Sequence, residues 1–165
     1  MAALSRQLLD GTLSLADWER AMQAETRAAV LSGAIAAQGG RAQMSAASYG
    51  RAGRALRDQY EFIRSFAREI ADGGQGLDGR LVARSRQYGH QVRVAFERER
   101  ARGQQQLGKR LVRNVLASAR HCGQCKALAA RGWMPVAEMP PIGTRTCLGS
   151  DRCRLEYRDA AEDAA

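Results

Sequence analysis

The sequence from Ser45 to Gly74, SAASYGRAGRALRDQYEFIRSFAREIADGG, carries the clearest periodicity in the chain. Small and apolar residues recur in it at alternating steps of four and three, which aligns them as one stripe along a helix. We predict a helix that begins after Ser45, ends before Gly73 and turns this stripe toward a partner. The stripe consists of Tyr49, Gly53, Leu56, Tyr60, Ile63, Ala67 and Ile70, widened by Phe62 and Phe66. The opposite side carries a basic row of Arg54, Arg57, Arg64 and Arg68.

A second helix is predicted upstream, from about Leu15 to Gln38. Ser14 and Asp17 form the pattern of a capping box, because the serine hydroxyl can accept an amide proton while the acidic residue stands three positions later. The pair Gly39-Gly40 is expected to stop the helix. Its apolar side is expected to hold Leu15, Trp18, Met22 and Ala29.

A third helix is predicted downstream, opening at Asp78 or Gly79 and extending to about Arg102. The stretch from Gly103 to Gly108 is interpreted as a breaker after it. The expected fold class is therefore mainly α, with an antiparallel three-helix body over residues 1–104 and a small C-terminal α+β module over residues 105–158. The buried side of this third helix is expected to carry Leu81, Ser85, Tyr88, Val92 and Phe96.

The composition limits the size of the core. The chain has 165 residues and is 45 % apolar, but much of that is alanine and only 5 % is aromatic. No secretory signal is recognisable in residues 1–9, and no run approaches the roughly 18–20 apolar residues that span a bilayer. We expect a soluble protein with a thin core, made in a reducing cytoplasm and not associated with a membrane.

The positive charge is concentrated in one segment. The net charge is +9, and residues 79–120 alone hold ten arginines and Lys109 against Glu97 and Glu99. Such a segment is suited to phosphates or to an acidic protein surface. The alternative is that arginine merely occupies solvated helix faces. The candidate binding residues are Arg84, Arg98, Arg102, Lys109, Arg110 and Arg113.

Four cysteines in the last third of the chain form the pattern Cys122-x2-Cys125-x21-Cys147-x5-Cys153. Two thiolates separated by two residues can bind one metal ion, and a later pair can complete a tetrahedral shell. Soft sulfur ligands favour zinc, held as a structural ion, and His121 is an auxiliary ligand candidate. Three alternatives stay open: reduced thiols packed without metal, one or two disulfides, and a redox-active Cys-x-x-Cys.

The segments around the cysteines predict a small mixed module. Residues 111–116 fit either a buried strand or a helical turn, and residues 126–130 fit a short helix that stops at Arg131-Gly132. Trp133 and Val136 are expected to pack over the cysteines. Residues 152–158 alternate as a short strand does, and the acidic tail, residues 159–165, is predicted to be disordered.

No motif for catalysis is recognisable. The chain lacks a phosphate-binding loop, a dinucleotide fingerprint and a pair of carboxylates with a supporting pocket. A cysteine nucleophile activated by His121 is disfavoured, because adjacent side chains seldom face each other. We therefore expect no enzymatic activity and no catalytic residues.

The order of the C-terminal motifs resembles a known family. It comprises His-Cys-x-x-Cys at residues 121–125, a Gly-Trp-x-Pro turn at residues 132–135, the stretch from Pro140 to Cys147, and Arg152 to Tyr157. These motifs resemble the C-terminal portion of phage head morphogenesis proteins, the minor head proteins of tailed phages of the Mu F-like and SPP1-type group. Residues 11–18 and 56–60 resemble the helical part, so the likeness covers most of the chain.

One departure from the family concerns the ligand set. Relatives often close with a Cys-x-x-x-Cys-x-Cys cluster, whereas here Asp151 stands where the middle cysteine would be. A bound metal would then be held by Cys122, Cys125, Cys147 and Cys153, or would recruit Asp151 or His121.

The resemblance implies a virion component of the head or neck, present in the host cytoplasm during assembly. Its expected partners are portal and/or capsid protein, with non-specific DNA contact a further expectation, and several copies would be present in each particle. It would assist capsid assembly, DNA retention or DNA delivery. Two alternative functions are a head-tail connector or adaptor protein of the neck and a zinc-containing DNA-binding protein.

Overall fold

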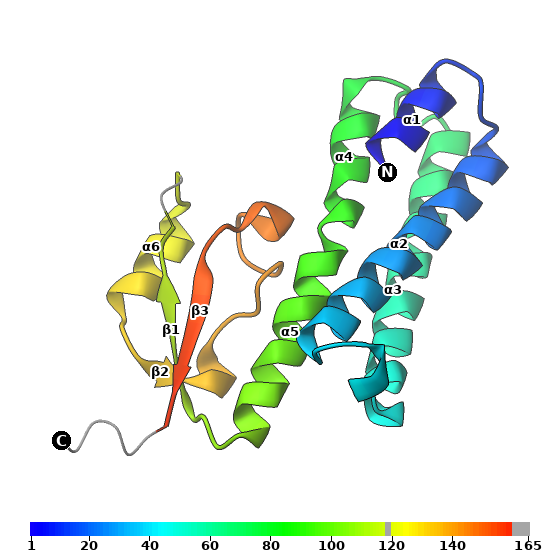
Figure 1. The fold of residues 1–165 in the computed structure, drawn as a ribbon. Helices are drawn as coiled ribbons and strands as arrows, with labels where there is room; N and C mark the ends of the chain where they lie inside the picture. Colours follow the sequence, from blue (N-terminus) through cyan, green and yellow to red (C-terminus); the bar gives the residue numbers. More distant parts are fainter. Residues whose placement is uncertain (118–119, 160–165) are drawn as a thin grey trace.

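The computed structural model describes residues 1–117 and 120–159, which form a helical body and a C-terminal module (Figure 1). The body contains α1 (Ala2–Leu9), α2 (Leu15–Ala37), α3 (Ala46–Ala71), α4 (Gly79–Gly89) and α5 (Gln91–Gln106). The module contains β1 (Leu111–Val115), α6 (Gly123–Ala130), β2 (Met134–Pro135) and β3 (Arg154–Arg158). The predicted mainly α class with a small C-terminal α+β module is confirmed.

The two long helices begin and end where their sequence signals lie. Ser14 caps α2, and its hydroxyl accepts a hydrogen bond from the backbone N–H of Asp17 at 3.1 Å. Ser45 caps α3 in the same way through the N–H of Ser48. Gly39, Gly40 and Gly73 have positive φ, so each helix ends beside a residue that tolerates left-handed backbone.

The body contains one more helix and one more break than the sequence indicated. Helix α1 was not predicted, and the third predicted helix is divided at His90 into α4 and α5, next to the weak helix former Gly89. Helix α5 continues to Gln106, so Gly103 does not end it. The side of the helix that faces the core changes across this break. Val92, which was expected to be buried, is 41 % exposed, and Val94 is buried instead.

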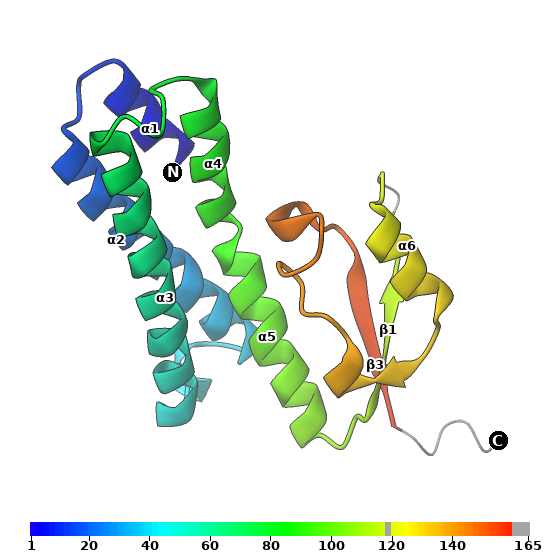
Figure 2. The same cartoon turned by 180° about the vertical axis from the view of Figure 1, so that it is seen from behind.

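Helix α2 is the centre of the body, and both α3 and α5 pack on it (Figure 2). Its crossing with α5 depends on Gly33, because a Cβ atom at this position would lie 2.0 Å from the carbonyl oxygen of Val92. The backbones of α3 and α5 stay apart from each other, and the two helices meet through side chains, as in the Arg51–Glu99 ion pair. The N-terminal part of the predicted α3 stripe is consequently exposed, including Tyr49 and Gly53, whereas Leu56, Ile63 and Ala67 are buried.

The main core lies where α1, α2, α3 and α4 meet. The Trp18 and Phe66 rings are 5.2 Å apart in an edge-to-face arrangement, and Tyr88 stacks on the other side of Phe66 at 6.3 Å. Trp18 donates its indole N–H to the Ser5 hydroxyl at 3.0 Å, and Ser5 donates to the hydroxyl of Ser85. This buried chain of hydrogen bonds attaches α1 to helices that lie far along the sequence.

Glu99 ties the far end of the body together. Only 5 % of its side chain is exposed, and it accepts hydrogen bonds from Arg51 of α3, from Gln38 at the end of α2 and from Arg102. The Arg51 guanidinium, followed by smaller effects of Arg102 and Gln38, holds the pKa of Glu99 below its usual range against the opposing effect of burial. The buried carboxylate of Glu99 therefore joins α2, α3 and α5.

The C-terminal module is an antiparallel sheet in the order β2-β1-β3, covered by α6. Residues 111–115, which the sequence left open, are a strand, and its partner β3 begins at Arg154. The module contacts α5 through Gly143, where a Cβ atom would lie 2.2 Å from a methyl group of Val94. Its buried core consists of Val112, Leu128, Met134, Met139, Ile142 and Leu155. Among the described residues, no helix has both the length and the apolarity needed to cross a bilayer.

We expect Gly33→Ala to destabilise the body by about 2 kcal/mol or more, because the added methyl group forces α2 and α5 apart. Urea unfolding followed by circular dichroism measures the loss. Gly53→Ala is the matched control, since a Cβ atom at position 53 meets nothing within 4 Å. That variant should be stabilised by about 0.5–1 kcal/mol through helix propensity. Equal effects of the two substitutions would contradict the close approach at Gly33.

We expect Glu99→Gln to destabilise the protein by about 2 kcal/mol near neutral pH, because charge-assisted hydrogen bonds from three side chains are weakened. Since the pKa of Glu99 is lowered in the folded protein, its contribution is present above the unfolded value of about 4.3 and is lost as the pH falls through the folded value. The stability difference from the unmodified chain should therefore narrow below about pH 4. Glu69→Gln is the control. Glu69 pairs with Arg84 but is much more exposed than Glu99, so its substitution should change stability much less at every pH.

Candidate metal centre

The four cysteines come from three separate segments of the module. Cys122 is the N-cap residue of α6, and its sulfur accepts a hydrogen bond from the N–H of Cys125 at 3.4 Å. Cys147 directly precedes a short 3-10 helix, Leu148–Ser150, and Cys153 directly precedes β3. Asp151 follows the 3-10 helix and lies between these last two cysteines in sequence.

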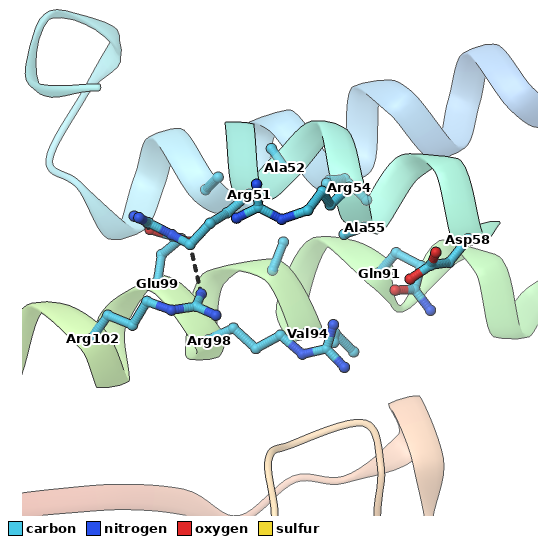
Figure 3. Close-up of a pocket in the computed structure, with 13 residues that line it drawn as sticks. Arg51, Ala52, Arg54, Ala55, Asp58, Gln91, Val94, Arg98, Glu99 and Arg102 are labelled. Carbon is cyan, nitrogen blue, oxygen red and sulfur yellow. Dashed lines mark hydrogen bonds and ion pairs between the residues drawn. The ribbon is translucent and has the colours of Figure 1, made fainter. Parts of the chain in front are cut away.

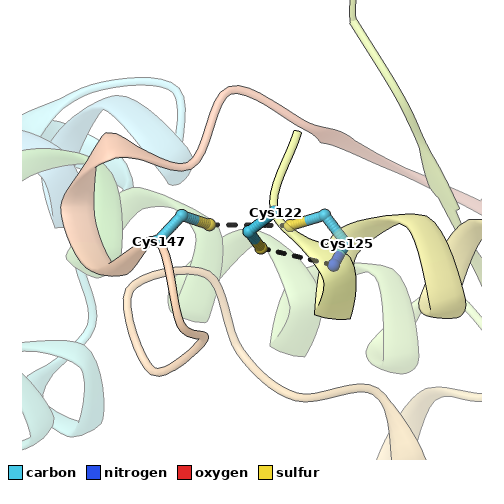
Figure 4. Close-up of side chains that lie close together, drawn as sticks. All are labelled: Cys122, Cys125 and Cys147. Atoms are coloured by element: carbon cyan, nitrogen blue, oxygen red, sulfur yellow. Dashed lines mark hydrogen bonds between the residues drawn. The ribbon is translucent and has the colours of Figure 1, made fainter. Parts of the chain in front are cut away.

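Three of the sulfur atoms form a compact group (Figure 4). The Sγ atoms of Cys122, Cys125 and Cys147 all lie within 4.8 Å of one another, and the separation between Cys125 and Cys147 is 3.5 Å. A tetrahedral metal ion with metal–sulfur bonds of about 2.3 Å holds its sulfur ligands roughly 3.8 Å apart. The group is therefore close to the spacing that one tetrahedral ion requires.

Cys153 approaches the same group from the other side of Cys125. The Sγ atoms of Cys125 and Cys153 and a carboxylate oxygen of Asp151 also lie within 4.8 Å of one another. Cys125 belongs to both groups and is thus the central residue of the site. The four closely spaced cysteines can form a metal-binding cluster.

His121 lies at the edge of this cluster with its ring oriented by the backbone. One ring nitrogen, Nε2, hydrogen bonds to the carbonyl oxygen of Ala117, and the other, Nδ1, is 3.8 Å from the sulfur of Cys153. A carbonyl oxygen can only accept a hydrogen bond, so Nε2 is the donor and Nδ1 of the neutral ring carries the lone pair. Histidines that bind metals commonly have this arrangement.

Asp151 is held by the side chain of Arg145 and by the backbone of Cys153. Its Oδ2 accepts a hydrogen bond at 3.1 Å from Arg145, and its Oδ1 accepts one at 2.8 Å from the N–H of Cys153. Both side chains of this ion pair are fully buried. The contacts of Asp151 place it as a support for Cys153 beside the cluster.

Arg145 connects this support to the sheet and to α6. It donates to Asn114 of β1 at 2.8 Å and to the carbonyl oxygen of Pro140 at 3.0 Å. Asn114 in turn donates to the backbone carbonyl of Cys125 at 3.1 Å. A buried arginine that donates to an internal carboxylate and to three further acceptors, including the Met139 sulfur, is a structural residue. Its only signal in the sequence was its place in the Pro140–Cys147 motif.

The surroundings of the four thiols shift their pKa values in different directions. Burial raises the pKa of Cys125 to about 12 and that of Cys153 to about 12, and burial also raises the pKa of Cys147. The N–H of Cys125 lowers the pKa of Cys122, which is the cysteine at the helix N-terminus. A cation at the centre would offset the cost of deprotonating the buried thiols.

The predicted basic residues do not gather at this site. Four of them form ion pairs: Arg84 with Glu69, Arg102 with Glu99, Lys109 with Asp159, and Arg113 with Glu156. The remaining two, Arg98 and Arg110, have exposed side chains on α5 and before β1.

Trp133 also lies away from the position expected for it over the cysteines. Its ring is in contact with two guanidinium groups, those of Arg113 at 4.8 Å and Arg158 at 4.2 Å from the ring centre. Val136, by contrast, packs against the module core. The predicted disordered tail falls on residues 159–165, of which only Asp159 belongs to the described residues.

No family model, curated protein or solved structure matches this chain.

We expect the protein, purified under reducing conditions, to bind one divalent metal ion per chain. Elemental analysis measures zinc, and the absorption of a Co²⁺-substituted sample reports thiolate ligands directly. Cys125→Ser should abolish binding, because Cys125 belongs to both groups of donors. Lys126→Ala, at an exposed neighbouring position, should retain the metal. Four freely reactive thiols in a sample without metal would contradict the site.

Proposed function

We propose that the cluster binds structural zinc through Cys122, Cys125, Cys147 and Cys153. Zinc would supply a tetrahedral cross-link and the positive charge that stabilises thiolates. The chain's own residues suit this role, because α6 provides an N-terminal turn and Arg145 fixes Asp151 next to Cys153. The module core contains only six buried apolar side chains, so a cross-link at one end of its sheet would contribute much of its stability.

We propose that the protein is a non-enzymatic minor head protein of a tailed phage. The observation that carries this proposal is that the segments with the family motifs meet at one cluster. Residues 121–125 are separated in sequence from residues 140–147 and 151–153, yet side chains of all three segments contact each other. Asp151, at the position of the family's middle cysteine, is 3.9 Å from the sulfur of Cys125.

Within this proposal the body docks on portal or capsid protein and the module is a rigid terminal unit. Protein contact is favoured over DNA contact, because four of the six candidate basic residues already have carboxylate partners. Such pairing reduces the number of cations that can release counterions from phosphates. DNA would then be a secondary partner.

We expect the protein to co-purify with phage particles induced from the strain that carries its gene. Quantitative mass spectrometry of nuclease-treated, gradient-purified particles should find it at a fixed ratio to portal protein, in few copies. A gene deletion should lower the yield of DNA-filled heads at least about tenfold, a change that plaque titre and electron microscopy both measure. Expression of the unmodified gene in trans should restore the yield.

The alternatives give different results in the same preparation. A ratio of one chain per portal subunit favours the connector protein of the neck. Absence from all particles, together with duplex DNA binding that weakens steeply with salt, favours the zinc-containing DNA-binding protein and contradicts the viral role.

A further inference from the structure

A groove lies on the body between α3 and α5, with α2 as its floor (Figure 3). It exists because both helices pack on α2 while their backbones stay apart, so that only side chains such as Arg51 and Glu99 cross between them. Its volume is about 200 Å³. The groove is independent of the cysteine cluster and of the viral proposal.

The floor of the groove is apolar and made of small residues. It is lined by Val30 and Ala34 of α2, Ala52 and Ala55 of α3, and Val94 and Ala95 of α5. Val30, Ala34, Ala52 and Val94 are already buried in the body, so a partner would meet the floor mainly through the partly exposed Ala55 and Ala95. Three helices with an apolar gap between the outer two offer the place that a fourth helix takes in a bundle.

The rim of the groove carries more basic than acidic side chains, namely four arginines against the exposed carboxylate of Asp58 and the buried carboxylate of Glu99. Arg51 and Arg54 extend from α3, and Arg98 and Arg102 extend from α5 on the opposite wall (Figure 3). Arg51 and Arg102 are occupied by Glu99. In the described part of the chain, neither Arg54 nor Arg98 makes a hydrogen bond or an ion pair, and both side chains are exposed.

These two features together select the occupant. We propose that the groove binds an amphipathic helix of an acidic partner protein, with small apolar residues on its buried side and carboxylates that meet Arg54 and Arg98. A nucleic acid backbone would use the rim but not the apolar floor. A second copy of this chain is disfavoured, because each copy has a net charge of +9.

The test uses the full chain and a defined probe. The groove follows α5 from Gln91 to Arg102, a rise of about 17 Å, so a fluorescein-labelled alanine-rich peptide of about 18 residues is long enough to be helical and to fill it. Its glutamates are spaced about seven residues apart on each flank of an alanine face, because like charges at i and i+4 destabilise an isolated helix. A peptide with lysine at the same positions is the negative control. Fluorescence anisotropy measures the dissociation constants.

The double variant Arg54→Glu/Arg98→Glu should weaken binding of the glutamate peptide by at least about tenfold. Arg57→Glu/Arg86→Glu makes the same change in charge at exposed positions outside the groove and should weaken it less than about threefold. Ala55→Trp fills the floor without changing charge and should also abolish binding. Circular dichroism and thermal unfolding establish that each variant is folded.

Several results would overturn the proposal. The first is an equal loss of affinity for the glutamate peptide in the two charge-reversal variants. The second is that the lysine peptide binds as tightly as the glutamate peptide. The third is that the glutamate peptide shows no saturable binding at low salt. Displacement of the peptide by duplex DNA, with DNA binding unaffected by Ala55→Trp, would identify a general polyanion surface. Self-association that Arg54→Glu/Arg98→Glu abolishes would replace the acidic partner with a second copy.

Discussion

Helix α5 is packed from two sides, and the rest of the architecture depends on that constraint. On one side its backbone meets Gly33 of α2, and on the other Val94 meets Gly143 of the module. Arg93 also donates to the carbonyl oxygen of Cys153, so this helix is joined to the cysteine region itself. Glu97 and Glu99 lie on the enclosed faces and are both buried, whereas Arg98 and Arg102 of the same helix are exposed.

The local part of this fold was readable from the sequence, because its signals lie within one or two helical turns. The Ser14 and Ser45 caps, the glycine stops and the α3 periodicity fixed the bounds of α2 and α3 closely. Helix α1 consists mostly of good helix formers but has only eight residues, too few for an isolated helix to be stable. Its position depends on the hydroxyl of Ser85, 80 residues away. The exposure of Val92 and the burial of Glu99 likewise follow from which helices meet, and residue periodicity carries no information about that.

At the candidate metal centre, too, local features were predictable from the sequence and contacts between distant segments were not. Residue type and spacing were enough to predict that four sulfurs would meet, because few other arrangements use two cysteine pairs at these separations. They could not predict that Arg145 and Asn114 would join the pairs, since an arginine between Thr144 and Thr146 gives no sign of burial. The network of Arg145, Asp151 and Asn114 is nevertheless what connects β1, α6 and the loop before β3. A buried and fully used ion pair fixes one relative position of these segments at some cost in stability.

The arginine content acquires a different meaning once its contacts are considered. A segment with a net charge of +9 suggests a polyanion partner, yet Arg84, Arg102 and Arg113 are bound to carboxylates of other elements or of their own helix. Two further guanidinium contacts, from Arg113 and Arg158, are made with the Trp133 ring. Arginine suits these roles because its planar group serves a carboxylate and an aromatic face at once. In a protein with few aromatic residues and a thin core, much of the arginine therefore acts as an internal linker, and the exposed remainder, which includes Arg54 and Arg98, has the clearest capacity for a partner.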